Sequence, residues 1–108
     1  MSKPVANKKD YIEALKEAIW NMHGYRASYL RTEAINETFQ GKTVWHGDVE
    51  VFRLVAHPDA KHAYAWAHLD GPNDSETRFV TVLEKPPVTD AKTAVQAAIM
   101  AQIKKPQS

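Results

Sequence analysis

The sequence predicts an α+β domain in which an N-terminal helix and a C-terminal helix flank an antiparallel sheet of three to four strands. Two observations support this prediction. Apolar residues recur three and four positions apart near both ends of the chain, and apolar and polar residues alternate in its middle. The chain has 108 residues, which is the size of one domain. The expected order of elements is therefore α-(β)-β-β-β-α within a single unit.

The first helix is expected over residues 8–23. Its apolar residues have helical spacing, and Gly24 stands where a C-terminal helix glycine belongs. The apolar stripe consists of Tyr11, Ile12, Leu15, Ala18, Ile19 and Met22. Residues 1–7 contain no periodic apolar pattern. They are predicted to form a disordered arm in front of a domain that spans residues 8–105.

Residues 25–43 fit neither periodicity cleanly, and two interpretations stay open. The stretch TEAINETF is compatible with a short helix, whereas ASYLRTEAI is compatible with an edge strand. We favour an extended segment that ends in a turn at Gln40-Gly41-Lys42, because glycine is typical of tight turns.

Three further strands and a second helix follow. The strands are TVWHGDVEVFRLVA, KHAYAWAHL and TRFVTVL, separated by the turn HPDA and the polar loop DGPNDSE. Pro86 and Pro87 end the last strand, because proline cannot donate a ladder hydrogen bond. The second helix is expected to start at Thr89 or Asp90 and to stop at Pro106. Its expected inner face consists of Ala94, Val95, Ala98, Ile99, Gln102 and Ile103.

A tight turn at residues 57–60 predicts a strand register in which Phe52 lies opposite Trp66. The polar loop DGPNDSE then places Trp66 near Val80 and Ala67 near Phe79. On this register both faces of the sheet are largely apolar, and two helices would cover only one of them. The other face then needs a second subunit, a ligand or residues 25–43 as cover. We predict an interface between two copies of the chain on that face, at Phe52, Leu54, Tyr64, Trp66, Val80 and Val82.

A binding site is predicted at the end of the sheet, where the same register brings together His46, Glu50, His68 and Arg78. Cross-strand charge pairs of this kind commonly stabilise a sheet. In a cleft, imidazole and carboxylate groups can also act as acid and base. The sequence contains no HExxH spacing, no nucleophile elbow and no phosphate-binding glycine loop. We therefore predict no metal, no cofactor and no catalytic residue.

Composition narrows the classes of function. The chain contains no cysteine, which excludes disulfides and thiolate chemistry. Its first residues lack the apolar core of a signal peptide, and no stretch is long enough to span a membrane, so we expect a cytoplasmic location without membrane contact. The net charge is +1, with lysines gathered mildly at the two ends. Dedicated nucleic-acid-binding proteins carry a stronger basic stripe, so nucleic acid is not the favoured partner.

The sequence has two resemblances, and neither implies an activity. The order α-β-β-β-α resembles that of the double-stranded-RNA-binding domain, which relies on lysines at the start of its last helix. Here that segment reads TDAKTAV, with Lys92 alone, and the loop DGPNDSE is acidic, so the resemblance implies topology and no RNA binding. The stretch GKTVWHGDVEVFRLVAHPDAKHAYAWAHL, followed by RFVTVLEKPPV, resembles small bacterial proteins of about this length. This second resemblance implies a bacterial source and an intact domain.

The sequence therefore favours a small non-enzymatic module that acts through protein contacts, as a homodimer. A nucleic-acid-binding regulatory protein that uses the basic ends is the first alternative. The second alternative is a small enzyme or ligand-binding protein with a site near His68.

Overall fold

The computed structural model describes residues 8–70 and 72–104. The predicted disordered arm at residues 1–7 and the predicted domain end at residue 105 lie outside the described residues. In chain order the elements are α1 (Lys8–His23), β1 (Ala27–Phe39), β2 (Lys42–Leu54), β3 (His62–Asp70), the short 3-10 helix η1 (Pro72–Asp74), β4 (Glu76–Leu83) and α2 (Ala91–Lys104). The predicted α+β class and the order of elements are confirmed. No helix in the described part of the chain is long and apolar enough to cross a membrane.

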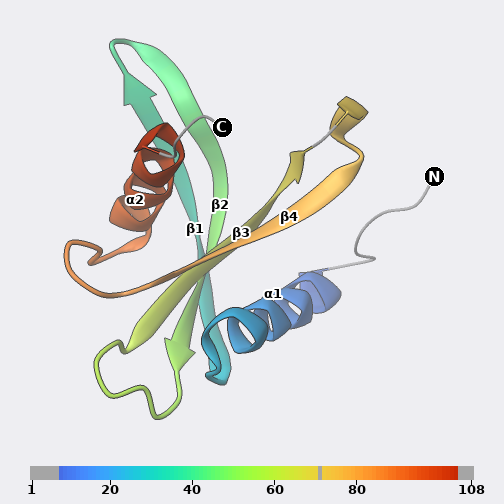
Figure 1. Cartoon of the computed structure of the whole chain (residues 1–108), viewed down its shortest axis with the longest axis vertical. Helices are drawn as coiled ribbons and strands as arrows, with labels where there is room; N and C mark the ends of the chain where they lie inside the picture. The colour runs from blue at the N-terminus through green and yellow to red at the C-terminus, as the bar shows by residue number, and fades with distance from the viewer. Residues whose placement is uncertain (1–7, 71, 105–108) are drawn as a thin grey trace.

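The four strands form one antiparallel sheet in the order β1-β2-β3-β4, so β1 and β4 are its edges. β1 and β2 pair along nearly their whole length, whereas β2 pairs with β3 only between residues 50–53 and 62–65. Beyond this short contact the β1–β2 and β3–β4 hairpins diverge (Figure 1). The sheet therefore has a narrow centre and two splayed hairpins.

Residues 25–43 are extended, as favoured from the sequence, and the short-helix alternative is wrong. Gln40 and Gly41 join β1 to β2 with positive φ angles of 52° and 79°. Two residues with positive φ form a tight hairpin turn whose twist matches that of the strands. The pairing of β1 with β2 shifts between Tyr29 and Arg31. Such a bulge changes which face the following side chains point to.

Both helices begin close to where the sequence predicts, and α1 also ends there, whereas the predicted stop of the second helix at Pro106 lies outside the described residues. Gly24 has a φ of 79°, and its N–H donates to the carbonyl of Trp20 over 2.8 Å, which closes α1. Asp90 is the N-cap of α2, since its Oδ1 accepts a 2.9 Å hydrogen bond from the backbone N–H of Thr93. Hydrogen bonds from Thr93 lower the pKa of the Asp90 carboxyl. The inner-face residues Gln102 and Ile103 lie outside the part of α2 whose side chains are described.

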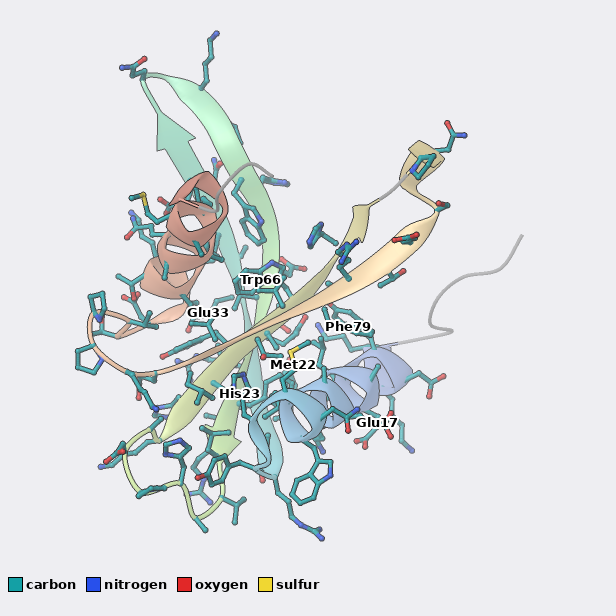
Figure 2. The ribbon with its side chains drawn as sticks, viewed as in Figure 1. Glu17, Met22, His23, Glu33, Trp66 and Phe79 are labelled. Carbon is teal, nitrogen blue, oxygen red and sulfur yellow. The ribbon has the colours of Figure 1, made fainter. Side chains whose placement is uncertain are left out.

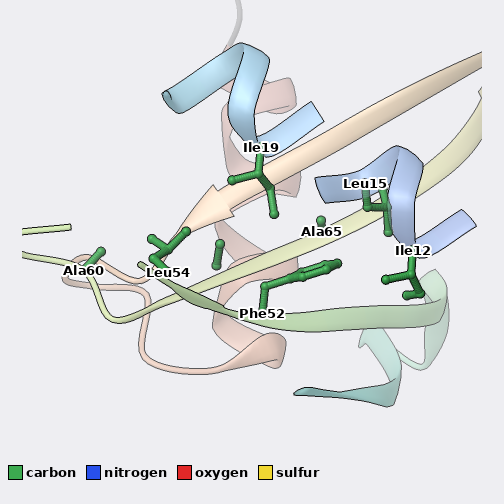
Figure 3. Packing of buried hydrophobic residues seen from close by; sticks show 8 residues of the cluster. Ile12, Leu15, Ile19, Phe52, Leu54, Ala60 and Ala65 are labelled. Atoms are coloured by element: carbon green, nitrogen blue, oxygen red, sulfur yellow. The ribbon is translucent and has the colours of Figure 1, made fainter. Parts of the chain in front are cut away.

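The two helices cover opposite faces of the sheet (Figure 1). The α1 cluster is built on Ile12, Leu15, Ile19, Phe52, Leu54, Ala60, Ala63 and Ala65 (Figure 3). The α2 cluster is built on Val49, Val51, Tyr64, Trp66, Val88, Ala91, Ala94 and Val95. Successive side chains along β2 and β3 therefore point in turn into the α1 cluster and into the α2 cluster. The expectation that both helices share one face is wrong, and each apolar face has its own helix.

The predicted register between β2 and β3 is also wrong. Phe52 lies opposite Ala63 instead of Trp66, a shift of three positions. A shift by an odd number moves every side chain of one strand to the other face relative to its neighbour. The register between β3 and β4, with Trp66 opposite Val80 and Ala67 opposite Phe79, is confirmed.

The connection between β2 and β3 explains this shift. β2 ends at Leu54, and Ala56 then takes a positive φ of 64°, which lies outside the β region of regular strands. The Nδ1 atom of His57 accepts hydrogen bonds from the backbone N–H groups of Asp59 and Ala60, both over 2.9 Å. The connection is therefore a longer loop that starts earlier than the tight turn expected from HPDA.

Candidate functional site

The four residues predicted to bind a ligand do not meet at one place. His68 and Arg78 are cross-strand partners on β3 and β4, as predicted. Glu50 points to the α1 face of the sheet, whereas His68 lines the α2 face. His46 is exposed on the outer half of the β1–β2 hairpin. The predicted grouping of His46 and Glu50 with His68 is wrong, because it depended on the mistaken register.

Glu50 instead connects α1 to the sheet. It is 1% exposed, and its carboxylate accepts hydrogen bonds from the Thr32 hydroxyl (2.5 Å) and the Lys8 ammonium (3.3 Å). The hydroxyl of Tyr29 lies 2.6 Å from the Thr32 hydroxyl. Because Thr32 gives its proton to the carboxylate, Tyr29 donates to Thr32. A buried carboxylate with a cation and a hydroxyl as donors is typical of a structural group.

A second polar cluster joins the start of β3 to the segment after β4. The Glu84 carboxylate lies 2.8 Å from the Tyr64 hydroxyl, which donates to it, and 2.9 Å from Nδ1 of His62. Burial and the hydrogen bond to Glu84 raise the pKa of the Tyr64 hydroxyl. The phenol therefore stays protonated and acts as a donor. These hydrogen bonds hold the segment that leads into α2 against β3, and the protonated Tyr64 hydroxyl does not act as a phenolate base.

The residues predicted as an interface are divided between the two faces. Phe52 and Leu54 belong to the α1 cluster, whereas Tyr64, Trp66, Val80 and Val82 belong to or pack against the α2 cluster. The expectation that all of them share one face is therefore wrong. Val80 and Val82 are only partly buried, and together with Trp66 they line a groove.

This groove opens between α2 and the β3–β4 hairpin, and we call it the α2 groove. It has a volume of about 890 Å³, within the range of roughly 300 to 1,000 Å³ that is usual for small-molecule sites. It exists because α2 packs mainly over β1 and leaves part of the β3–β4 hairpin uncovered (Figure 1). Most of the described lining residues are apolar, among them Trp45, Trp66, Val80, Val82, Ala98 and Ile99.

Two tryptophans form one wall of the α2 groove. The rings of Trp45 and Trp66 meet edge to face, with centroids 5.5 Å apart and planes inclined by 69°. Gly47 lies on the same face of β2 as Trp45, two residues further along the strand. A Cβ atom at Gly47 would lie 3.1 Å from the Trp45 ring, which is tighter than ordinary contact. Glycine at this position therefore allows the indole to lie flat along β2.

The polar side chains that line the described part of the α2 groove are His23, His68, Thr81 and Lys85, and no carboxylate is among them. Nε2 of His23 lies 2.6 Å from Oγ1 of Thr81. Figure 2 shows Met22 and His23 at the end of α1, on the opposite side of β4 from Trp66. His23 thus reaches the groove around the edge strand. Burial lowers the pKa of His23, and the nearby Lys85 contributes to this shift.

The lowered pKa of His23 predicts a dependence of stability on pH. The unfolded chain takes up this proton at the ordinary histidine pKa of 6.5, above the pKa in the folded protein. The contribution is therefore fully present above pH 6.5 and is lost as the pH falls toward the folded pKa. We expect the free energy of unfolding to fall less between pH 7.5 and about 5.5 in His23→Gln than in the unchanged protein. Urea denaturation followed by circular dichroism measures this difference, and equal pH slopes would contradict the assignment.

The chain matches no protein-family model, no curated protein and no solved structure. Among the described residues, no group of histidine and acidic side chains is arranged to hold a metal ion. The functional interpretation therefore depends on the geometry and charge of the α2 groove.

Sequence reasoning identified part of this groove and missed the rest. It singled out His68, Trp66, Val80 and Val82, all of which line the groove. It missed Trp45, His23 and Lys85, which come from β2, from the end of α1 and from the segment after β4. A signal near Trp45 was available, because a glycine inside a strand, here Gly47, often marks a place where another group approaches the backbone closely.

Proposed function

We propose that this protein is a binding module, without a catalytic role, that takes an apolar molecule with an anionic group in the α2 groove. The observation that supports this best is the partial cover of the α2 face. Val80 and Val82 are left partly buried beside a groove of about 890 Å³. An apolar ligand that fills this space removes their surface from water, which is favourable by about 25 cal/mol per Å².

The charge of the groove supports an anionic ligand. Lys85 is a basic side chain that lines the groove and is exposed to solvent. His68 adds a second basic side chain to the lining, and the described lining residues include no acidic one. A carboxylate, sulfonate or phosphate on an apolar body is complementary to this arrangement.

Self-association is the second candidate, and the position of β4 favours it. β4 is an edge strand, and its Val80 and Val82 face the α2 groove. A second copy of the chain that pairs with this edge would extend the sheet and cover the groove. Light scattering distinguishes ligand binding from self-association, because a mass near 12.2 kDa would show a monomer, whose groove is open to a ligand. The cytoplasmic location expected from the sequence stays a prediction.

Decanoate tests the proposal, with decanol as the uncharged ligand of equal length. In a Trp20→Phe background the remaining tryptophans, Trp45 and Trp66, both line the α2 groove. We expect a saturable change in their fluorescence with decanoate. Decanol should bind about fivefold more weakly, the ratio for a partly exposed ion pair of about 1 kcal/mol.

Two variants and one matched control complete this experiment. Lys85→Ala should weaken decanoate to the level of decanol, whereas Lys61→Ala, which removes an exposed lysine outside the groove, should change nothing. Val80→Asp should weaken both ligands, because it places a negative charge on the apolar lining. Equal binding of decanoate to all three variants, or no saturable change in any of them, would contradict the proposal.

A further inference from the structure

A second groove lies on the other side of the molecule, between α1 and the start of the edge strand β1. We call it the α1 groove; its volume is about 780 Å³. Among its lining residues are Glu13, Glu17 and Trp20 of α1, Ala27 and Ser28 of β1, and Val55. None of these residues lines the α2 groove. The two grooves are therefore separate features.

The edge of β1 beside this groove has backbone groups that no strand in the described part of the chain pairs. β1 is the first strand of the sheet and contacts β2 on one side only. The N–H of Val55 donates to the carbonyl of Arg26 over 2.9 Å, so the peptide groups of Arg26 face β2. In an antiparallel ladder the direction alternates from residue to residue. The N–H and C=O groups of Ala27 and Tyr29 therefore point away from β2, toward the open edge.

Apolar side chains are exposed around the same edge. Trp20 is 51% exposed, Val55 48%, Leu30 42% and Tyr29 36%. The guanidinium carbon of Arg26 lies 5.9 Å from the centre of the Trp20 ring, so a cation already rests against this indole. Apolar surface next to an unpaired strand edge is typical of surfaces that bind an extended peptide.

The wall of the groove formed by α1 is mainly acidic. Asp10, Glu13 and Glu17 follow one another at helical spacing and all line the groove. Lys16 lies 3.2 Å from Glu13 and offsets part of this charge. Figure 2 shows Glu17 on the side of α1 that faces away from β4. An extended segment in the groove would therefore have the carboxylates of α1 along one side, and the backbone of β1 with the Arg26 side chain along the other.

We propose that the α1 groove binds an extended, basic segment of a partner protein, which adds to β1 as a further strand. The outward peptide groups of Ala27 and Tyr29 bond to its backbone. Its alternate side chains place lysine or arginine against Glu13 and Glu17 and apolar groups against Trp20 and Val55. Two copies of this chain paired through β1 would each carry the same acidic wall, so charge complementarity favours a basic partner over a second copy.

The test uses a short peptide of alternating lysine and valine, blocked at both ends, and a control peptide in which glutamate replaces lysine. Amide hydrogen exchange followed by NMR is the readout. We expect the lysine peptide to slow exchange at the N–H groups of Ala27 and Tyr29. The glutamate peptide should bind at least about tenfold more weakly.

Two variants distinguish strand addition from simple charge attraction. Ala27→Pro removes an outward N–H and leaves the N–H groups that face β2, so it should abolish binding of the lysine peptide while the fold is kept. Glu17→Lys with Glu13→Lys reverses the charge of two exposed side chains and should weaken binding at least about fivefold. If Ala27→Pro does not fold, the variant with Glu13→Lys and Glu17→Lys tests the inference by itself. Decanoate binding in the α2 groove should be unchanged in both variants, which separates this inference from the proposed function.

Three outcomes would overturn the inference. The first is equal binding of the two peptides. The second is binding that survives the charge reversal at Glu13 and Glu17. The third is a protein that excludes the lysine peptide and has twice the mass of 12.2 kDa, because a second copy would then occupy the edge of β1.

Discussion

Replacing Trp66 by alanine is expected to lower the free energy of unfolding by about 3 to 5 kcal/mol. Trp66 is 3% exposed at the centre of the α2 cluster, and its ring meets that of Trp45 edge to face. The substitution leaves a cavity between β3 and α2 that the fixed strands cannot close. Small domains have a free energy of unfolding of only about 5 to 15 kcal/mol, so the substitution would remove much of the stability of the fold.

Trp20→Ala is the matched control for this prediction, because it makes the same chemical change at a side chain that is 51% exposed. It should cost no more than about 1 kcal/mol. Urea denaturation followed by circular dichroism gives both values. A Trp66→Ala protein as stable as Trp20→Ala would contradict the burial of Trp66 beneath α2.

Phe52→Ala is expected to have an equally large effect through the opposite face, about 3 to 5 kcal/mol. Phe52 is fully buried beneath α1, and its ring contacts that of Tyr29 at 5.8 Å between centroids. A loss below about 1 kcal/mol in the same denaturation experiment would contradict its place in the core.

Two milder substitutions test whether the clusters are separate layers. Ile19→Val lies in the α1 cluster and Val95→Ala in the α2 cluster, on opposite sides of the sheet. Their costs should add within about 0.5 kcal/mol, as expected for residues that share no contact. A larger coupling would mean that the two helices pack in one layer.

The local elements of this fold could be predicted from the sequence. The apolar spacing from Tyr11 to Met22 and the glycine at position 24 set the limits of α1, and Asp90 marked the start of α2. The alternation in β3 and β4 and the polar loop between them predicted the correct register of that hairpin. These features depend on contacts between residues that are close in the chain.

The arrangement of the elements could not be predicted, and one loop accounts for much of the difference. The positive φ of Ala56 and the side-chain acceptor at His57 lengthen the connection between β2 and β3. This loop chemistry moves the partner of Phe52 from Trp66 to Ala63 and exchanges the faces. The mistaken register placed Glu50 on the same face as His68. In the structure Glu50 is buried on the α1 face, where its carboxylate accepts hydrogen bonds from Lys8 and Thr32.

The candidate site was found in part for the same reason. Trp66, Val80, Val82 and His68 were singled out because they alternate within one hairpin, and that hairpin has the predicted register. The α2 groove also needs the position of α2 over β1 and the approach of His23 around β4. Helix position depends on which side chains pack across layers, and the apolar spacing of a helix does not specify its partner face.

The most direct test of the α2 groove as a ligand site is an NMR titration of the nitrogen-15-labelled protein with decanoate. The indole N–H signals of Trp45 and Trp66 and the backbone amides of Val80 and Ile99 should shift together and saturate at one ligand concentration. The indole of Trp20, which lies in the α1 groove, should not shift. Shifts that are largest at Trp20, or that spread over both faces of the sheet without saturation, would contradict the α2 groove as the binding site.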